Sequence, residues 1–247
     1  MSYILHGKIL SSINEHSDRY NLLAFIREQD PPRGGWIGMH YKEMNVLYEI
    51  FMKNNIAVCV PTFHEKDHVF LFLESLNSLQ YNFKEVLIVN GDYGDETSDL
   101  INECKSYMNL NIKEIPGKKN ELWRGTVNRG LNKILIEYGS NIDILLCNID
   151  IIFEDSTIDN LLNSSKILGR RNIIGAVGIY KDKVFCSGVK VKSWLFPIRN
   201  LHPFENILRE ELDNCDYAYV DFLPCRCIFI PSDVNLLIDS ISYKKLA

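Results

Sequence analysis

Asn148 and Asp150 stand near the end of a long apolar run, and their types and spacing could hold a metal ion. The run covers residues 141–153 and is rich in Ile and Leu, which is typical of a strand buried on both faces of a parallel sheet. An unpartnered carboxylate would be costly there, so Asp150 needs a specific role. Strand side chains alternate between faces, so both polar side chains are predicted to share one face. At the carboxyl end of a strand, such a carboxylate could hold a hard cation against a phosphate.

A purely structural role for Asp150 is the alternative. Its carboxylate could open a turn or cap the helix that follows, as Asp does in many loops. Taken alone, Asp150 fits this role better than a metal site. The balance changes only if other polar loops of the chain reach the same place.

An alternation of strands and helices begins at residue 56 and predicts an α/β fold. Alternation of this kind builds a mostly parallel sheet flanked by helices, with right-handed crossovers. The expected order is strand 56–60, helix 67–79, strand 85–89, a helix to about 107, strand 111–115, a helix to about 138, the strand before Asp150, helix 156–168, strand 172–177, a hairpin arm at 184–191 and a last strand at 226–230.

Three polar loops follow strands of this predicted sheet. They are residues 61–65, 90–97 and 148–150, and each one leaves a strand at its carboxyl end. Because the carboxyl ends of parallel strands share one edge of a sheet, we expect these loops to lie close together, and ligands of open α/β sheets bind at that edge. Within the second loop, Asp95 is also expected to cap the next helix.

The first 55 residues have a different pattern. Two helix-like stretches, 17–28 and 41–53, flank a loop rich in Pro and Gly. No residue of this region suggests chemistry, so we interpret residues 1–55 as an N-terminal helical appendage of unknown role and residues 56–247 as the main domain.

Composition narrows the class of protein. A net charge of −5 over 247 residues, with mixed signs, argues against a nucleic-acid partner. Seven scattered cysteines, several inside apolar runs, indicate core thiols in a reducing cytoplasm rather than a zinc cluster. No apolar run approaches the length of a membrane span, so we expect a cytoplasmic protein. Peripheral attachment to the inner face of a membrane and homo-oligomer formation both remain open.

Five motifs occur in an order that resembles a known family. Pro-Thr-Phe-His-Glu and Asn-Gly-Asp-Tyr-Gly-Asp-Glu-Thr follow the first two strands, and Trp-Arg-Gly-Thr-Val-Asn-Arg-Gly, Leu-Leu-Cys-Asn-Ile-Asp and Val-Asp-Phe-Leu-Pro-Cys-Arg-Cys come later. Together they resemble the family 2 glycosyltransferases with the GT-A fold, a Rossmann-like sheet flanked by helices. The nearest branch by likeness is the rhamnosyltransferase-like enzymes of bacterial surface polysaccharide synthesis. The resemblance covers residues 56–247.

The resemblance implies a role for particular residues. Asp150 would bind a divalent cation, Mg²⁺ or Mn²⁺, and Asp221 is the acidic candidate for the catalytic base. The residues that would bind the nucleotide and the donor sugar are Pro61, Thr62, His64, Glu65, Asn90, Asp92, Trp123, Gly125, Asn128, Asn148 and Arg226.

The implied function is inverting, metal-dependent sugar transfer from a nucleoside-diphosphate sugar to a glycan or a lipid-linked saccharide. Three departures from the family pattern are visible: Asn90 replaces the usual Asp, Cys225 and Cys227 replace Gly, and the family normally continues past Ala247 into a segment that supplies the base. A catalytically silent module that binds nucleotide sugar or supports a partner enzyme is therefore the alternative. A sugar-phosphate nucleotidyltransferase ranks lower, because the first loop is neither Gly-rich nor basic.

Overall fold

The computed structural model describes residues 55–79, 81–91, 93–118, 122–193, 199–214, 217–224 and 226–234. All of them belong to the compact unit Ile50–Ala247. Most of the proposed N-terminal appendage, and the predicted site residue Asp92, lie outside the described residues.

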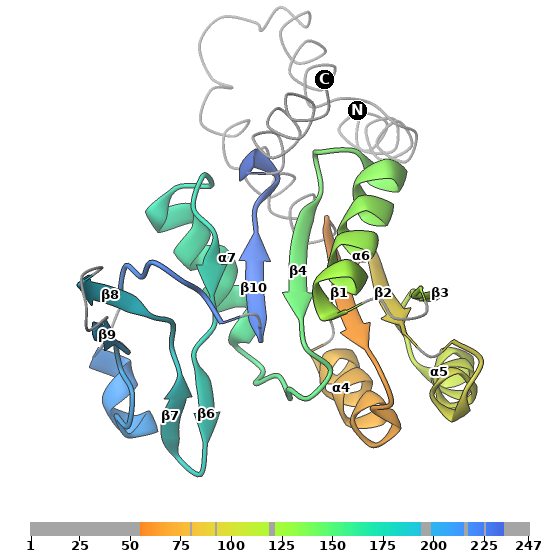
Figure 1. The fold of residues 1–247 in the computed structure, drawn as a ribbon, viewed down its shortest axis with the longest axis horizontal. Helices are drawn as coiled ribbons and strands as arrows, with labels where there is room; N and C mark the ends of the chain where they lie inside the picture. The colour runs from red at the N-terminus through yellow and green to blue at the C-terminus, as the bar shows by residue number, and fades with distance from the viewer. Residues whose placement is uncertain are drawn as a thin grey trace, which may run out of the picture. The chain divides into compact units, whose positions relative to one another are not determined.

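The main domain is built on a six-stranded sheet with the strand order β3-β2-β1-β4-β10-β5 (Figure 1). The first four strands along the chain run parallel, whereas β10 runs antiparallel to both β4 and β5. The prediction of a mostly parallel sheet is confirmed. The strands are β1 (Ile56–Thr62), β2 (Glu85–Asn90), β3 (Ile112–Pro116), β4 (Asp143–Cys147), β5 (Ile174–Gly175) and β10 (Cys227–Ile230).

Helices cover both faces of this sheet, as expected. Alternate residues of β1 point to opposite faces, so Val58 packs in one core and Cys59 in the other. The first core takes side chains from α4 (Lys66–Ser78), α5 (Glu96–Tyr107) and α7 (Thr157–Leu168), and the second core takes side chains from α6 (Trp123–Tyr138).

Several predicted boundaries were wrong. β1 runs on through Pro61 to Thr62, and Pro61 is tolerated because β4 pairs with β1 only as far as Cys59. β4 ends at Cys147, so Asn148 and Asp150 lie in the loop after it and do not share a strand face as predicted. The expected strand 172–177 is reduced to the two residues of β5.

The contact of α6 with the sheet depends on Gly130. A Cβ atom at this position would collide with the sulfur of Cys59 and would lie 3.0 Å from Cγ2 of Val89. We expect Gly130→Val to lower the free energy of unfolding by about 2 kcal/mol, because an overpacked core forces neighbouring side chains to move. Asn132→Val places the same residue at an exposed position of the same helix. Urea unfolding should show a large decrease in the free energy of unfolding for Gly130→Val only. An equal decrease for Asn132→Val would contradict this packing.

A smaller antiparallel region follows α7. β6 (Gly178–Tyr180) pairs with β7 (Lys183–Cys186), and β8 (Lys190–Ser193) pairs with β9 (Arg199–Leu201). The predicted hairpin arm 184–191 is therefore divided between β7 and β8. A short 3-10 helix, η1 (Arg209–Asn214), leads to the segment that enters β10.

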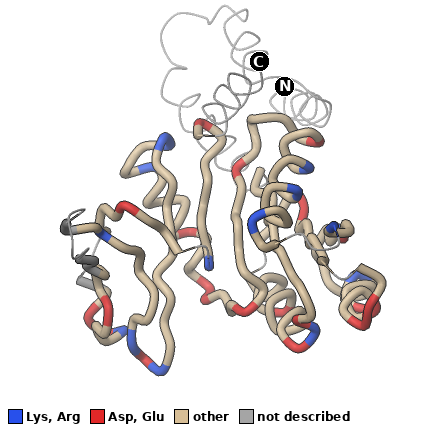
Figure 2. Tube along the Cα trace, in the orientation of Figure 1, with Lys and Arg blue, Asp and Glu red and all other residues tan. Residues whose placement is uncertain are grey.

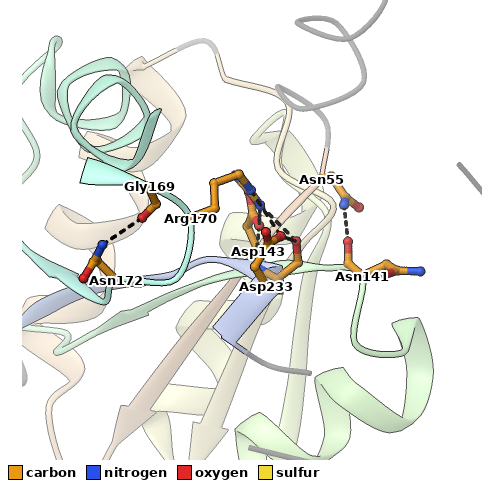
Figure 3. Close-up of polar contacts among 8 residues, drawn as sticks. Asn55, Asn141, Asp143, Gly169, Arg170, Asn172 and Asp233 are labelled. Carbon is orange, nitrogen blue, oxygen red and sulfur yellow. Dashed lines mark hydrogen bonds and ion pairs between the residues drawn. The ribbon is translucent and has the colours of Figure 1, made fainter. Parts of the chain in front are cut away.

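At the amino end of β4, a polar cluster joins segments that are far apart along the chain (Figure 3). Asp143 accepts a hydrogen bond from Nη2 of Arg170 at 2.5 Å and another from the backbone N–H of Ser232 at 2.8 Å. Arg170 also lies 3.5 Å from Asp233. The fully buried carboxylate of the central strand is therefore Asp143, whereas the sequence pointed to Asp150.

Charges of both signs are interspersed over the helices and loops (Figure 2). Among the described residues, no helix is both long and apolar enough to span a membrane.

Candidate active site

The three predicted polar loops leave the sheet at one edge, as expected. β1 pairs in parallel with β2 and with β4, so their carboxyl ends point the same way (Figure 1). The backbone N–H of Gly91 donates to the carbonyl of Thr62 at 2.9 Å, and Gly117 donates to the carbonyl of Asn90 at 2.7 Å. A Cβ on Gly117 would lie 2.8 Å from Cα of Gly91, so only glycine allows these loops to approach so closely.

Four predicted nucleotide-binding residues lie at the end of β1 and in the loop after it. Pro61 and Thr62 are buried in the strand, and His64 is exposed with a positive φ of 55°. The hydroxyl of Thr62 donates to Oε2 of Glu65 at 3.5 Å. Glu65 precedes α4 but makes no capping hydrogen bond with its side chain. Its carboxylate therefore faces the loop rather than stabilising the helix.

Asn90 is fully buried at the end of β2. Its Nδ2 atom lies 3.2 Å from Oδ1 of Asp95, 3.3 Å from Oγ of Ser98 and 3.0 Å from Oε1 of Glu114. These contacts use the donors of the amide to hold the loop in shape. Binding of a nucleotide by Asn90 stays a prediction. To bind one through its Nδ2 atom, Asn90 would have to give up one of these hydrogen bonds.

Asp95 caps α5, as the sequence predicted. Its Oδ1 accepts hydrogen bonds from the backbone N–H groups of Thr97 and Ser98. Burial acts to raise the pKa of Asp95, but the hydrogen bonds from Asn90, Thr97 and Ser98 outweigh it and hold the pKa below its ordinary value of 3.8. The charged cap therefore stabilises the fold above that pH, and the stabilisation is lost as pH falls through the lowered pKa.

We expect Asp95→Ala to lower the free energy of unfolding by about 1–2 kcal/mol at neutral pH. Because the wild-type cap loses its charge in acid, the difference should shrink once the pH falls below the ordinary value of 3.8. Denaturant unfolding across this range measures the effect, and Asp99→Ala in the same first turn is the control. A difference that stays constant with pH would contradict the charged cap.

The start of α6 carries Trp123, Gly125 and Asn128. Trp123 is 44% exposed and Asn128 is also exposed. Gly125 and Asn128 border a surface groove of about 620 Å³ between α6 and the end of β3. The other residues that line it are Ile115, Pro116, Lys118, Arg129, Asn132, Lys133 and Ile136. The charged side chains of this lining are all basic, which suits an anionic ligand.

Asn148, Asp150 and Arg226 come together where β4 ends and β10 begins. The backbone N–H of Asn148 donates to the carbonyl of Arg226 at 2.9 Å. Nη1 of Arg226 donates to Oδ2 of Asp150 at 2.7 Å. Oδ1 of Asn148 is buried and has no hydrogen-bond partner in the described part of the chain. An unpartnered buried acceptor is rare, and here it lies two residues from a carboxylate.

These residues fit a hard divalent cation. Mg²⁺ and Mn²⁺ prefer oxygen ligands, and Mg²⁺ in particular takes one or two from the protein and the rest from phosphate groups and water. Oδ1 of Asn148 and the carboxylate of Asp150 are two such oxygens. Among the described residues, no group of three or more His, Cys, Asp and Glu side chains could hold a metal. A cation at this edge would therefore need a phosphate-bearing ligand to complete its coordination.

Asp221, the predicted catalytic base, lies against the β8 arm. Its Oδ2 accepts a hydrogen bond from the backbone N–H of Val191 at 2.7 Å, and its own N–H donates to Val189 at 2.9 Å. No described hydrogen bond or ion pair joins Asp221 to Asn148 or Asp150. Its role as a base stays a prediction.

Phe185 is a neighbour of this site that the sequence analysis missed. The guanidinium carbon of Arg226 lies 5.1 Å from the centroid of its ring. Alternation within β7, with Val184 buried and Phe185 exposed, could have indicated the outward direction of the ring. It could not have indicated the contact with Arg226, because Arg226 lies 41 residues further along the chain.

A family model described as "Glycosyl transferase family 2" matches residues 57–218, more than half of the chain. The chain belongs to glycosyl transferase family 2. The resemblance drawn from the five motifs is thereby confirmed at the level of the family. A search of curated protein sequences finds no match to this chain.

Several solved structures are similar to this glycosyltransferase family member. A mannosyltransferase from Pyrobaculum calidifontis, in complex with GDP-Man and Mn²⁺, is 16% identical with a TM-score of 0.41, and the match covers 51% of this chain and 36% of that one. S. aureus TarS 1-349 in complex with UDP-GlcNAc is 16% identical with a TM-score of 0.45, and the match covers 76% of this chain and 47% of that one. The complex of the same protein with UDP is 16% identical with a TM-score of 0.46, and the match covers 76% of this chain and 49% of that one. The chain thus spans about a third to a half of the length of these proteins.

Proposed function

We propose that this chain transfers a sugar from a nucleoside-diphosphate sugar to a glycan or lipid-linked saccharide acceptor in the cytoplasm. The observation that carries the proposal is the buried Oδ1 of Asn148, which has no hydrogen-bond partner among the described residues and lies two residues before Asp150. It stands at the edge of the sheet where β1 and β2 also end. Membership of glycosyl transferase family 2 supports it. The rhamnosyltransferase-like branch remains a prediction.

Each loop has a distinct task in this proposal. The loop of Thr62 and Glu65 and the loop after Asn90 bind the nucleotide, while Asn148 and Asp150 hold a divalent cation. When bound, the cation offsets the negative charge that develops on the leaving diphosphate. Its loss on substitution of Asp150 should therefore weaken both binding and transfer.

The acceptor side of the proposal rests on Asp221. A carboxylate there would take the proton of an acceptor hydroxyl that attacks from the face opposite the leaving group. A single displacement of this kind inverts the configuration of the anomeric carbon. Trp123, Gly125 and Asn128, at the start of α6, would line the donor.

Release of free nucleoside diphosphate from a panel of UDP-, dTDP- and GDP-sugars, offered with saccharide acceptors and Mn²⁺, tests the proposal. We expect release from one class of donor, dependent on the cation and lost in Asp150→Asn. Binding of a donor without release under any condition would favour the silent module instead. Absence of both binding and release would overturn the proposal.

A further inference from the structure

The Asp150 carboxylate has two competing partners. In the structure its Oδ2 atom accepts a hydrogen bond from Arg226 at 2.7 Å. The proposed divalent cation would need the same carboxylate. A guanidinium and a dication at the two oxygens of one carboxylate repel each other and share its single negative charge, so each weakens the binding of the other.

Arg226 is positioned for an exchange of partners. The side chains of Arg226 and Asp150 are 40% and 33% exposed, so water can replace either partner and the ion pair is weak compared with a buried one. A planar guanidinium offers several donors in a rigid fork, which suits bidentate binding of phosphate as well as carboxylate. Loss of the contact with Asp150 therefore leaves Arg226 able to bind a diphosphate.

Phe185 holds the guanidinium near the site. Its ring centroid lies 5.1 Å from the guanidinium carbon, within the range of a cation–π interaction. Gly178 in β6 makes room for the ring, because a Cβ there would lie 2.9 Å from Cε1 of Phe185. Tyr180 contacts the ring edge-on, with centroids 6.4 Å apart. These contacts of the ring come from its own hairpin, so they do not depend on whether Arg226 binds Asp150 or another anion.

We propose that Arg226 is an internal counter-ion that occupies Asp150 until the divalent cation and the donor arrive, and then transfers to the donor diphosphate while Phe185 keeps the guanidinium in place. This inference rests on the proposed function and deepens it. Arg226 makes binding of the cation and of the diphosphate mutually dependent, since the cation alone must displace it and the diphosphate then provides its new partner.

Titration of the full chain with Mn²⁺ alone, by electron paramagnetic resonance of the free ion, tests the competition. Without Arg226, the cation meets neither a competitor nor a repelling charge, so Arg226→Gln should bind Mn²⁺ about fivefold more tightly than wild type. Calorimetric titration with a nucleoside diphosphate in saturating Mn²⁺ should show the opposite change, about tenfold weaker binding, because a charge-assisted contact is lost. A general loss of structure would weaken both.

Two controls separate this effect from simpler ones. Arg209→Gln removes the guanidinium of another exposed ion pair, 2.9 Å from Glu154, and should leave the affinity for Mn²⁺ unchanged. If Arg209→Gln tightens Mn²⁺ binding as much as Arg226→Gln, net charge explains the result and the proposal is overturned. Arg226→Lys keeps the charge and should bind Mn²⁺ as wild type does.

Substitution of Phe185 tests the positioning role. Phe185→Tyr keeps an aromatic face and should retain the wild-type affinity for the nucleoside diphosphate, whereas Phe185→Leu keeps bulk but loses the face and should weaken it about threefold. Equal affinities for the two variants would exclude a role of the ring in holding Arg226.

Asp150→Asn distinguishes failure of this inference from failure of the proposed function. If Asp150→Asn binds Mn²⁺ as tightly as wild type, the cation site itself is wrong and both proposals fall. If Asp150→Asn loses Mn²⁺ while Arg226→Gln equals wild type in both titrations, the cation site stands and the exchange of Arg226 is overturned.

Discussion

Asp150→Asn should abolish Mn²⁺-dependent binding of a nucleoside-diphosphate sugar and slow sugar transfer by about 10²–10³-fold, the range expected when several kcal/mol of metal-based charge stabilisation are lost. The variant keeps the size of the side chain and an oxygen that can accept from Arg226. It removes only the negative charge, which is what binds a dication strongly. Asn148 alone offers a neutral oxygen and cannot replace it.

Isothermal titration calorimetry with and without Mn²⁺ measures the binding effect, and release of nucleoside diphosphate measures the rate. Asp155→Asn is a suitable control, because Asp155 is an exposed acidic residue in the same loop. It should behave as wild type in both measurements. Donor titrations of the wild-type chain that do not change when Mn²⁺ is added would contradict the role assigned to Asp150.

Local sequence patterns predicted most of the sheet and its helices. β1, β2 and β4 are buried on both faces and most of their residues are apolar, so they appear as apolar runs that can be recognised without knowing their neighbours. The end of α6 was predicted from Gly139, since glycine is the usual residue where a helix ends in a conformation of positive φ. The φ of Gly139 is 71°. The polar loops at one edge followed directly from the parallel order of the strands.

Features that depend on contacts between distant segments were not predictable in the same way. The apolar pattern of β10 predicted a strand, but it did not predict that β10 runs antiparallel to β4. The sequence of a short buried strand does not indicate its direction in the sheet. The ion pair of Arg226 with Asp150 joins residues 76 positions apart.

The buried carboxylate of the central strand illustrates this limit. Asp150 was predicted to lie within the buried strand, yet it lies beyond the end of β4 and is partly exposed. Asp143, at the first position of β4, is the residue with no exposed surface. Its partners are Arg170 and Ser232, which lie 27 and 89 residues away, so no local pattern could reveal that its charge is compensated.

Asp143→Ala should therefore lower the free energy of unfolding by about 3–5 kcal/mol, because it leaves the largely buried guanidinium of Arg170 without its main partner. The cluster joins the start of β4 to the segment after α7 and to the end of β10 (Figure 3). Breaking it should loosen the antiparallel side of the sheet. Urea unfolding followed by circular dichroism measures the loss.

Burial, and not the length of the ion pair, decides this effect. Glu96 and Lys66 form a pair of similar length, 2.6 Å, but their side chains are 79% and 50% exposed. Glu96→Ala should leave the unfolding midpoint unchanged, since water replaces the lost partner. An equal decrease in the free energy of unfolding for Glu96→Ala and Asp143→Ala would show that burial of the ion pair does not cause the effect.

Removing both charges should be less harmful than removing one. In Asp143→Leu/Arg170→Met no buried unpaired charge remains, because Asp233, which also pairs with Arg170, is 41% exposed. The double variant should therefore be more stable than Asp143→Ala. Recovery should be incomplete by about 1–3 kcal/mol, because the backbone N–H of Ser232 loses the acceptor that Asp143 provides at 2.8 Å. A double variant that is no more stable than Asp143→Ala would indicate that the loss comes from packing rather than from an uncompensated charge.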